Sequence, residues 1–224
     1  MSVDFFENGL CFHCNLAINE LEEFFRYHSE TELSWKTKDD DFQKKLNEIL
    51  ANYPEEHHQE IVESYSWDLH INQYKYPNIH RESILITIYN FLENQLNQLC
   101  KIISESIDSK IKLKHLYGQG IERSFLYLSK VAEIDFSKMG REMPYIRNVN
   151  ELRNLIVHNG GILPSGKREN FYEFINKNPE VDGEIGRGVS IGYEFINEVI
   201  KMLIDFFKLL DVEIQVFINK CLTT

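Results

Sequence analysis

Three polar residues in the stretch ELRNLIVHNGG, residues 151–161, have side chains suited to acid–base chemistry at an anionic group. The imidazole of His158 can take up and release a proton near neutral pH. Arg153 is always positively charged, and its planar donors match the oxygens of a phosphate. Asn154 lies four residues before His158 and shares its face on a helix. The stretch therefore fits either a catalytic helix or an ordinary helix end.

The spacing of Arg153 and His158 limits how they can act together. Five residues on a regular helix separate two side chains by about 140° around the axis, so the two are not direct neighbours. Either Arg153 bends toward a shared cleft, or two copies of the motif meet across a symmetric dimer. Gly160 and Gly161 are expected to end the helix just after His158, where the helix dipole favours a positive side chain. A histidine followed by Asn159 and Gly160 is also a common helix end, and both interpretations stay open at this point.

Apolar residues recur with helical periodicity along almost the whole chain. Pro54 and Pro77 are expected to end helices, and the acidic run at 39–41 suits a helix N-terminus. The predicted helices span residues 9–28, 39–52, 55–74, 79–105, 109–116, 121–133, 145–158 and 192–218.

This order of elements predicts an all-α helical bundle with one insertion before the last long helix. Residues 1–76 form an N-terminal helical extension in this interpretation, and residues 77–224 form the bundle. The insertion covers about residues 159–190, which are rich in glycine, proline, asparagine and charge. A small hairpin is expected near GEIGRGVSIG, residues 183–192.

The composition indicates a folded chain, because 43% of its 224 residues are hydrophobic and can form a substantial core. The sequence does not begin with a cationic segment followed by an apolar run. Its longest apolar stretches, such as SILITIYNFL at 83–92, are too short to cross a bilayer. We therefore expect a cytoplasmic protein that has no membrane partner.

The four cysteines have the spacing of neither a disulfide framework nor a zinc site. Cys11 and Cys14 form a lone CxxC around His13, without a second Cys/His pair at comparable spacing. Cys14 falls on the apolar stripe of the first predicted helix, so buried reduced thiols are favoured over a metal or redox role. No metal and no other cofactor is predicted.

The net charge of −11 argues against a protein that coats nucleic acid with its whole surface. The charge is uneven, because residues 138–168 hold six basic residues and only two acidic ones. This segment surrounds the 151–161 stretch and predicts a locally basic cleft on an acidic protein. Its basic residues are Lys138, Arg141, Arg147, Arg153, Lys167 and Arg168.

The hexamer RNLIVH at 153–158 resembles the R-N-x-x-x-H form of the motif that marks the HEPN superfamily. The surrounding pattern is similar as well. The stretch IYNFLENQLNQL at 88–99 resembles the family's long helix before the motif, and an amphipathic helix follows at 192–218. The resemblance covers about residues 78–218. The N-terminal extension and the 159–190 insertion depart from a minimal member of the family.

The resemblance implies a metal-independent endoribonuclease of the kind found in toxin–antitoxin and phage-defence systems. In that family a homodimer brings two motifs to one cleft. Carried over, His158 is the general base or acid for attack of an RNA 2′-OH on the adjacent phosphate. Arg153 stabilises the charge on the phosphoryl oxygens, and Asn154 orients groups beside them. RNA is the implied substrate, and an antitoxin or a neighbouring defence protein is the implied partner.

Further residues are weaker candidates. Glu93 points either toward the cleft or into solvent beside the apolar stripe, and Asn159 is either a supporting site residue or a helix cap. The candidates for contact with RNA are Arg147, Lys167 and Arg168.

Two other functions compete with this one. A non-catalytic HEPN-like module would use the same cleft to bind RNA, a nucleotide or a partner protein, and the acidic net charge favours it. A helical scaffold would use the dimer face alone.

Overall fold

The computed structural model describes residues 4–166 and 169–223, and it confirms the predicted all-α class. A two-stranded antiparallel sheet accompanies the helices. The helices and strands are α1 (His13–Leu50), α2 (His58–Ser64), α3 (Ser66–His70), α4 (Tyr76–Ser106), α5 (Gly120–Val131), α6 (Glu142–Asn159), α7 (Glu169–Lys177), β1 (Val181–Asp182), β2 (Ser190–Ile191) and α8 (Tyr193–Thr223).

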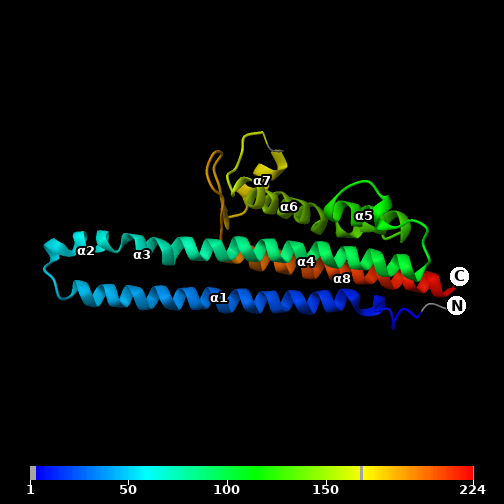
Figure 1. Ribbon diagram of the computed structural model, residues 1–224, viewed down its shortest axis with the longest axis horizontal. Coiled ribbons are helices and arrows are strands. Elements are labelled where there is room, and N and C mark those ends of the chain that lie inside the picture. The colour runs from blue at the N-terminus through cyan, green and yellow to red at the C-terminus, as the bar shows by residue number, and fades with distance from the viewer. Residues whose placement is uncertain (1–3, 167–168, 224) are drawn as a thin grey trace.

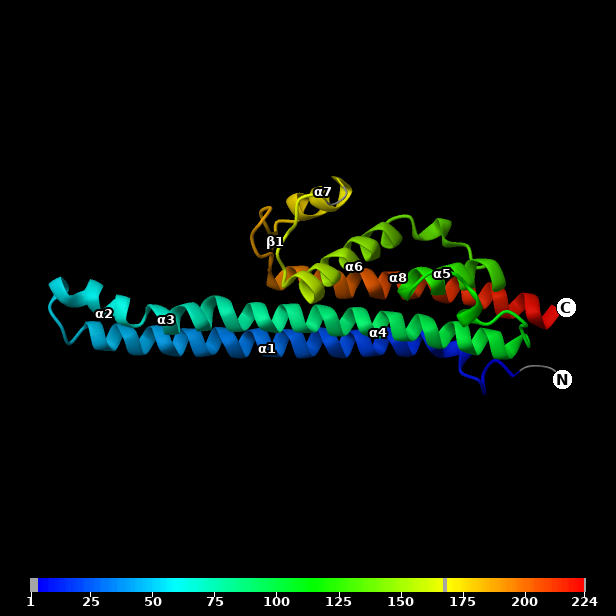
Figure 2. The ribbon, with the colours of Figure 1, turned by 45° about the horizontal axis from the view of Figure 1, so that its top comes forward.

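Three long helices, α1, α4 and α8, lie side by side and form the body of the molecule (Figure 1). The shorter helices α5, α6 and α7 lie together on one side of this body, and the hairpin stands beside α7 (Figure 2). The two ends of the chain lie at the same end of the rod. At the opposite end, α1 and the segment that returns into α4 extend beyond the start of α8 (Figure 1).

α8 is apolar around most of its circumference. Phe195, Phe206 and Leu210, on different turns, are fully buried. Because a helix of this kind must be covered on several sides, its packing against α1, α4 and α6 follows from its sequence. α8 and α4 thus both lie between the motif helix α6 and α1 in the network of helix contacts.

α1 is one continuous helix of 38 residues, which corresponds to a length of about 57 Å. The prediction of two helices, at 9–28 and 39–52, is therefore wrong in this region. Residues 29–38 contain neither glycine nor proline, so nothing in them interrupts a helix. The acidic run at 39–41 lies inside α1, where Asp39 Oδ2 accepts a hydrogen bond from Gln73 Nε2 at 3.3 Å.

The two prolines that were expected to end helices behave differently. Pro54 follows α1 and precedes a 3-10 turn at Glu55–His57, as predicted. Pro77 lies in the first turn of α4, so the prediction that it ends an element is wrong. Proline is tolerated there because its missing N–H has no partner in a first turn. A π-helical turn at Ile71–Lys75 leads directly into this position.

The part of the chain that projects beyond α8 is here called the arm, residues 29–75. It is a two-helix projection made by the second half of α1 and the returning segment with α2 and α3 (Figure 1). Leu46 is the buried residue that this half of α1 contributes, whereas Leu33, Trp67 and Tyr74 are exposed. The arm therefore buries much less apolar surface than the bundle.

The core crosses the predicted boundary between residues 76 and 77. Leu10 and Leu21 of the N-terminal region belong to the same buried cluster as Leu85 and Phe206. The four cysteines are free thiols, of which Cys14 and Cys100 are buried and Cys11 and Cys221 are partly buried. Burial raises the pKa of the Cys14 thiol, which keeps it protonated and unreactive.

The predicted insertion contains α7 and the hairpin, in which Val181 pairs with Ile191. The loop of the hairpin returns to the residues that follow α6: Val189 N–H donates to the Gly161 carbonyl at 2.9 Å. The insertion therefore braces the exit of the motif helix. The helix expected at 109–116 is reduced to a 3-10 turn at Leu113–His115.

Candidate functional site

The motif helix α6 ends where its sequence predicts. Gly160 and Gly161 have φ of 59° and 75°, a left-handed conformation that costs other residues about 1–2 kcal/mol. The Gly161 N–H donates to the Leu155 carbonyl at 3.2 Å and closes the helix end. His158 lies in the last turn with its side chain exposed. The glycine pair therefore leaves the imidazole accessible from solvent.

Arg153 is held against α4 by neutral groups. Its Nη2 donates to Asn90 Oδ1 at 3.0 Å and its Nη1 to Asn154 Oδ1 at 3.0 Å. The guanidinium also lies over the ring of Tyr89, 5.7 Å from the ring centre. Among the described residues Arg153 has no carboxylate within ion-pair distance. Its position is therefore fixed, and no carboxylate of residues 4–166 or 169–223 is paired with its positive charge.

Tyr89 is buried, and its ring lies beneath this guanidinium. Burial raises the pKa of its hydroxyl, and the nearby carboxylate of Glu93 adds to that increase, while Arg153 opposes it. The ring therefore stays neutral at physiological pH and offers the π face that attracts a cation.

Asn154 connects Arg153 to the next turn of α6. Its Oδ1 accepts from Arg153, and its Nδ2 donates to Asn150 Oδ1 at 3.1 Å. These two bonds fix the orientation of the amide, because its oxygen and nitrogen each have one defined partner. Asn154 lies one turn before His158 on the same face, so the prediction that these two residues share a face agrees with the helix α6.

Arg153 and His158 leave α6 in different directions. Arg153 turns inward to α4, whereas His158 is exposed and makes no side-chain hydrogen bond within the described residues. Their positions differ by about 7.5 Å along the helix axis. Two apolar residues near His158 are also solvent-accessible, Val157 at 42% and Ile162 at 51% of their surface. One chain thus offers an anchored cation and a separate accessible imidazole.

Glu93 lies one turn after Tyr89 on α4, close to the start of α5. A β-carbon added to Gly120 would lie 3.8 Å from its Oε1. The carboxylate is therefore beside the N-terminus of α5, where the positive end of the helix dipole favours a negative charge. This position beside the helix end explains the presence of Glu93 without a catalytic role, although its charge also helps to raise the pKa of Tyr89.

Arg147 points to α5 and is paired. Its Nε and Nη2 donate to the two carboxylate oxygens of Glu122 at 2.7 and 3.2 Å, and both side chains are about half exposed. Lys138 is likewise paired, with Glu213 Oε1 at 2.7 Å. The acids that balance these two cations come from distant parts of the sequence. The basic excess of residues 138–168 is thus partly compensated in space.

The remaining predicted site residues are less defined. Asn159 is the last residue of α6, is exposed, and its carbonyl accepts from the Ile162 N–H at 3.2 Å. This is the expected behaviour of a residue at a helix end. Lys167 and Arg168 lie outside the described residues.

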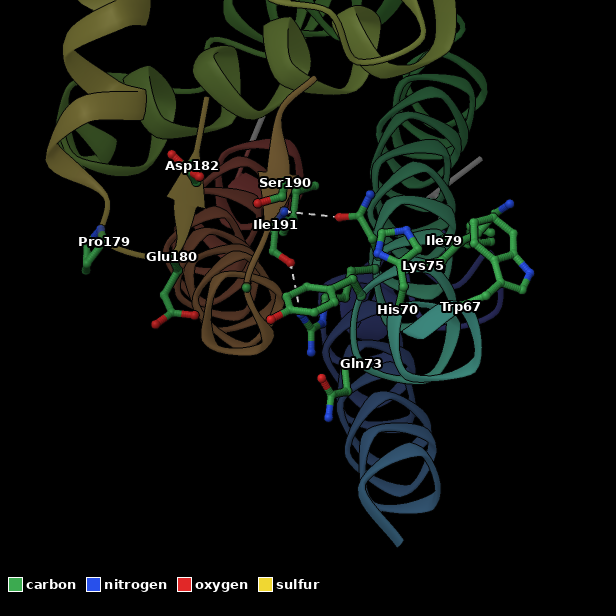
Figure 3. Close-up of a pocket in the computed structure, with 14 residues that line it drawn as sticks. Trp67, His70, Gln73, Lys75, Ile79, Pro179, Glu180, Asp182, Ser190 and Ile191 are labelled. Atoms are coloured by element: carbon green, nitrogen blue, oxygen red, sulfur yellow. Dashed lines mark hydrogen bonds between the residues drawn. The ribbon is translucent and has the colours of Figure 1, made fainter. Parts of the chain in front are cut away.

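A pocket that the sequence did not indicate lies elsewhere, between the arm and the hairpin (Figure 3). Its volume is about 640 Å³, within the usual range for small-molecule sites. Trp67, His70 and Tyr74 stack in succession along one wall, and Glu180 and Asp182 line the opposite side. Trp67, His70 and Tyr74 are spaced i, i+3, i+7, which is the sequence signal of a shared helix face. The hairpin on the other side of the pocket is more than a hundred residues away in the sequence.

None of the helices within the described ranges combines the length and the apolar character needed to cross a membrane. Comparisons of the chain with protein families, with curated proteins and with solved structures found no match.

Proposed function

We propose that this chain is a HEPN-like, metal-independent endoribonuclease that acts as a cytoplasmic homodimer in a toxin or phage-defence role. One observation carries the proposal. Arg153 is a cation held in place by two amide oxygens and an aromatic ring, with no carboxylate paired to it among the described residues, on the helix that ends at the exposed His158. A preorganised, uncompensated cation is suited to a phosphate, whereas a structural arginine is normally paired.

In the proposed reaction, His158 removes the proton from an RNA 2′-OH, and the resulting oxygen attacks the adjacent phosphorus. The bond from phosphorus to the 5′-oxygen breaks, and that oxygen takes up a proton. The products are a 2′,3′-cyclic phosphate and a 5′-OH. Arg153 stabilises the negative charge on the phosphoryl oxygens, and Asn154 holds the guanidinium in position.

A homodimer brings together Arg153 and His158, which a single chain holds apart. Because Arg153 turns toward α4 and His158 faces outward, the proposal requires the His158 of one copy to approach the Arg153 of the other. The exposed Val157 and Ile162 beside His158 offer apolar surface for such a contact. An isologous interface of this kind would create two equivalent sites.

The test is cleavage of a tRNA and an mRNA by the purified chain, with His158→Ala and Arg153→Ala as variants. Both should reduce the rate by at least about 100-fold while the far-UV circular dichroism and Tm stay unchanged. His115→Ala, which alters a histidine far from α6 in the chain, serves as the matched control and should cleave like wild type. Full activity in His158→Ala would contradict the mechanism.

A second function, a non-catalytic RNA- or protein-binding module, is favoured by the net charge of −11 and by the pairing of Arg147 with Glu122. It predicts that wild type cleaves neither RNA, with or without a partner protein, but still retains one of them. In that case Arg153→Ala should weaken binding more than His158→Ala, because only Arg153 carries a permanent charge.

A further inference from the structure

Two histidines and a glutamate meet where the arm leaves the bundle. His28 and Glu32 lie one turn apart on α1, and His80 lies on the first turns of α4. One ligand atom of each residue lies within 4.8 Å of the other two. His28 is fully buried. Buried imidazoles and a carboxylate gathered in this way are the ligand types that divalent transition metals select.

The two imidazoles face each other directly. His28 Nδ1 lies 3.0 Å from His80 Nε2. The ring centres are 5.2 Å apart and the planes differ by only 15°, so the nitrogens lie between the rings and the rings meet edge to edge. Nitrogens of two imidazoles bound to one tetrahedral zinc lie about 3.3 Å apart, given Zn–N bonds of about 2.0–2.1 Å. The observed spacing needs an increase of only a few tenths of an ångström.

The outer contacts of the cluster orient its atoms as outer-shell groups do in metal sites. His28 Nε2 donates to the Tyr193 carbonyl at 3.2 Å, which leaves the lone pair of Nδ1 directed at His80. Glu32 accepts two hydrogen bonds from Arg81, each 2.7 Å long. A carboxylate has about four lone-pair sites, so Glu32 retains capacity for a metal while Arg81 holds it.

The charges around the cluster and its access to solvent also suit the binding of a cation. The carboxylates of Glu32 and Glu194 both act on His28, against the single guanidinium of Arg81. The side chains of Glu32 and Arg81 retain 13% and 22% exposure, and Arg81 lines the pocket of Figure 3. The cluster is thus open to solvent on one side.

We propose that His28 Nδ1, His80 Nε2 and a carboxylate oxygen of Glu32 bind one divalent transition metal ion, with Zn²⁺ as the best fit, and that the ion joins α1 to α4 at the base of the arm. On binding, the proton of His80 moves from Nε2 to Nδ1, so both rings stay neutral. Each ring must tilt by roughly 35° to direct its lone pair at a tetrahedral ion. The χ2 torsion of histidine is broad, so this tilt is a small change. Water completes the coordination.

This inference revises the prediction that the chain has no metal site. The sequence shows only His28 and Glu32 at i, i+4 spacing, while the third ligand comes 48 residues after Glu32. The proposed ion is structural, so the inference is independent of the ribonuclease proposal.

The test uses the full chain freed of metal with EDTA and then dialysed. Titration with CoCl₂ should give visible absorption bands of tetrahedral Co²⁺ that saturate at one ion per chain and disappear when ZnCl₂ is added. A hundredfold excess of Zn²⁺ over its Kd should raise Tm by roughly 5–10 °C. The same concentrations of MgCl₂ or CaCl₂ should leave Tm unchanged, because these ions prefer sites made of oxygen ligands.

Two variants alter proposed ligands, and two further variants serve as controls. His80→Gln and Glu32→Gln should each weaken Co²⁺ binding by more than about 100-fold. His70→Gln, a histidine on the neighbouring α3, is the control and should bind like wild type. Cys11→Ser tests the alternative thiol site and should also bind like wild type.

The proposal is overturned if wild type shows no Co²⁺ spectrum and no Zn²⁺-dependent rise in Tm. It is equally overturned if the spectrum survives in His80→Gln or is lost in Cys11→Ser. RNA cleavage by His80→Gln should equal that of wild type, which separates the outcome from that of the ribonuclease test.

Discussion

The Nη2 of Arg153 donates a hydrogen bond to Oδ1 of Asn90 across 3.0 Å, and this bond ties the motif helix α6 to α4. The partner is an amide, so it positions the guanidinium without cancelling its charge. In the same helix Arg147 has a carboxylate partner in Glu122. Two arginines six residues apart therefore have different electrostatic surroundings.

Asn90→Asp should convert the amide contact of Arg153 into an ion pair. The added carboxylate competes with a phosphate for the guanidinium, so we expect RNA cleavage to fall by about 10- to 100-fold with little change in Tm. Asn94→Asp adds the same charge one turn further along α4 at an exposed position, and it should retain activity. Equal losses in the two variants would show that charge on α4, and not the contact with Arg153, is responsible.

Removal of metal should not abolish cleavage. The proposed ribonuclease reaction uses only His158, Arg153 and Asn154, so the initial rate in EDTA should stay within about twofold of the rate in Mg²⁺ at temperatures well below Tm. The reaction products, resolved by mass spectrometry, should carry 2′,3′-cyclic phosphates. A strict requirement for Mg²⁺ would rule out this chemistry.

Gly160→Ala should destabilise the protein through its backbone alone. No atom lies within 4 Å of the added β-carbon, but φ is 59°, so the cost is the left-handed conformation of about 1–2 kcal/mol. For a chain of this size we expect Tm to fall by roughly 3–6 °C in a thermal melt. Gly188→Ala, equally open but without positive φ, should change Tm much less.

His13 should make stability depend on pH. Its Nε2 donates to the Gln95 carbonyl at 3.0 Å, and burial lowers its pKa. The folded state therefore takes up a proton less readily than the unfolded state, whose histidine pKa is about 6.5. Its contribution to stability is complete above that value and is lost as the pH falls toward the lower folded pKa, by at most about 1.4 kcal/mol per pH unit.

Urea denaturation of wild type and His13→Gln between pH 8 and pH 5.5 measures this contribution. Other histidines titrate in both proteins and cancel in the comparison. The free energy of unfolding of wild type should decline relative to the variant as the pH falls. Parallel curves would mean that His13 is not responsible.

Truncation of a leucine should lower the free energy of unfolding much more in the bundle than in the arm. Leu210 of α8 is fully buried, whereas Leu33 of α1 is 65% exposed. We expect Leu210→Ala to lower the free energy of unfolding by about 2–5 kcal/mol and Leu33→Ala to change it by less than about 0.5 kcal/mol. A large loss in Leu33→Ala would indicate that the arm is covered in solution, for instance by a second copy of the chain.

Much of the local structure follows from residue types alone. Helical periodicity predicted α4, α5, α6 and α8 close to their observed bounds, since each needs an apolar face every three to four residues. Gly160 and Gly161 were sufficient to place the end of α6, because left-handed backbone is readily available only to glycine. The exposure of His158 and the face that it shares with Asn154 follow from that helix end.

Contacts between distant residues were decided only by the tertiary structure. No local signal distinguishes Arg147, which meets Glu122, from Arg153, which meets Asn90, because each partner belongs to another helix. The acidic run at 39–41 suggested the start of a new helix, but it lies inside α1, where Asp39 accepts a hydrogen bond from Gln73 of the returning segment. His28, Glu32 and His80 likewise share a site only because α1 and α4 lie side by side. Periodicity reports which face of a helix is buried, whereas the packing of helices determines which side chains meet there.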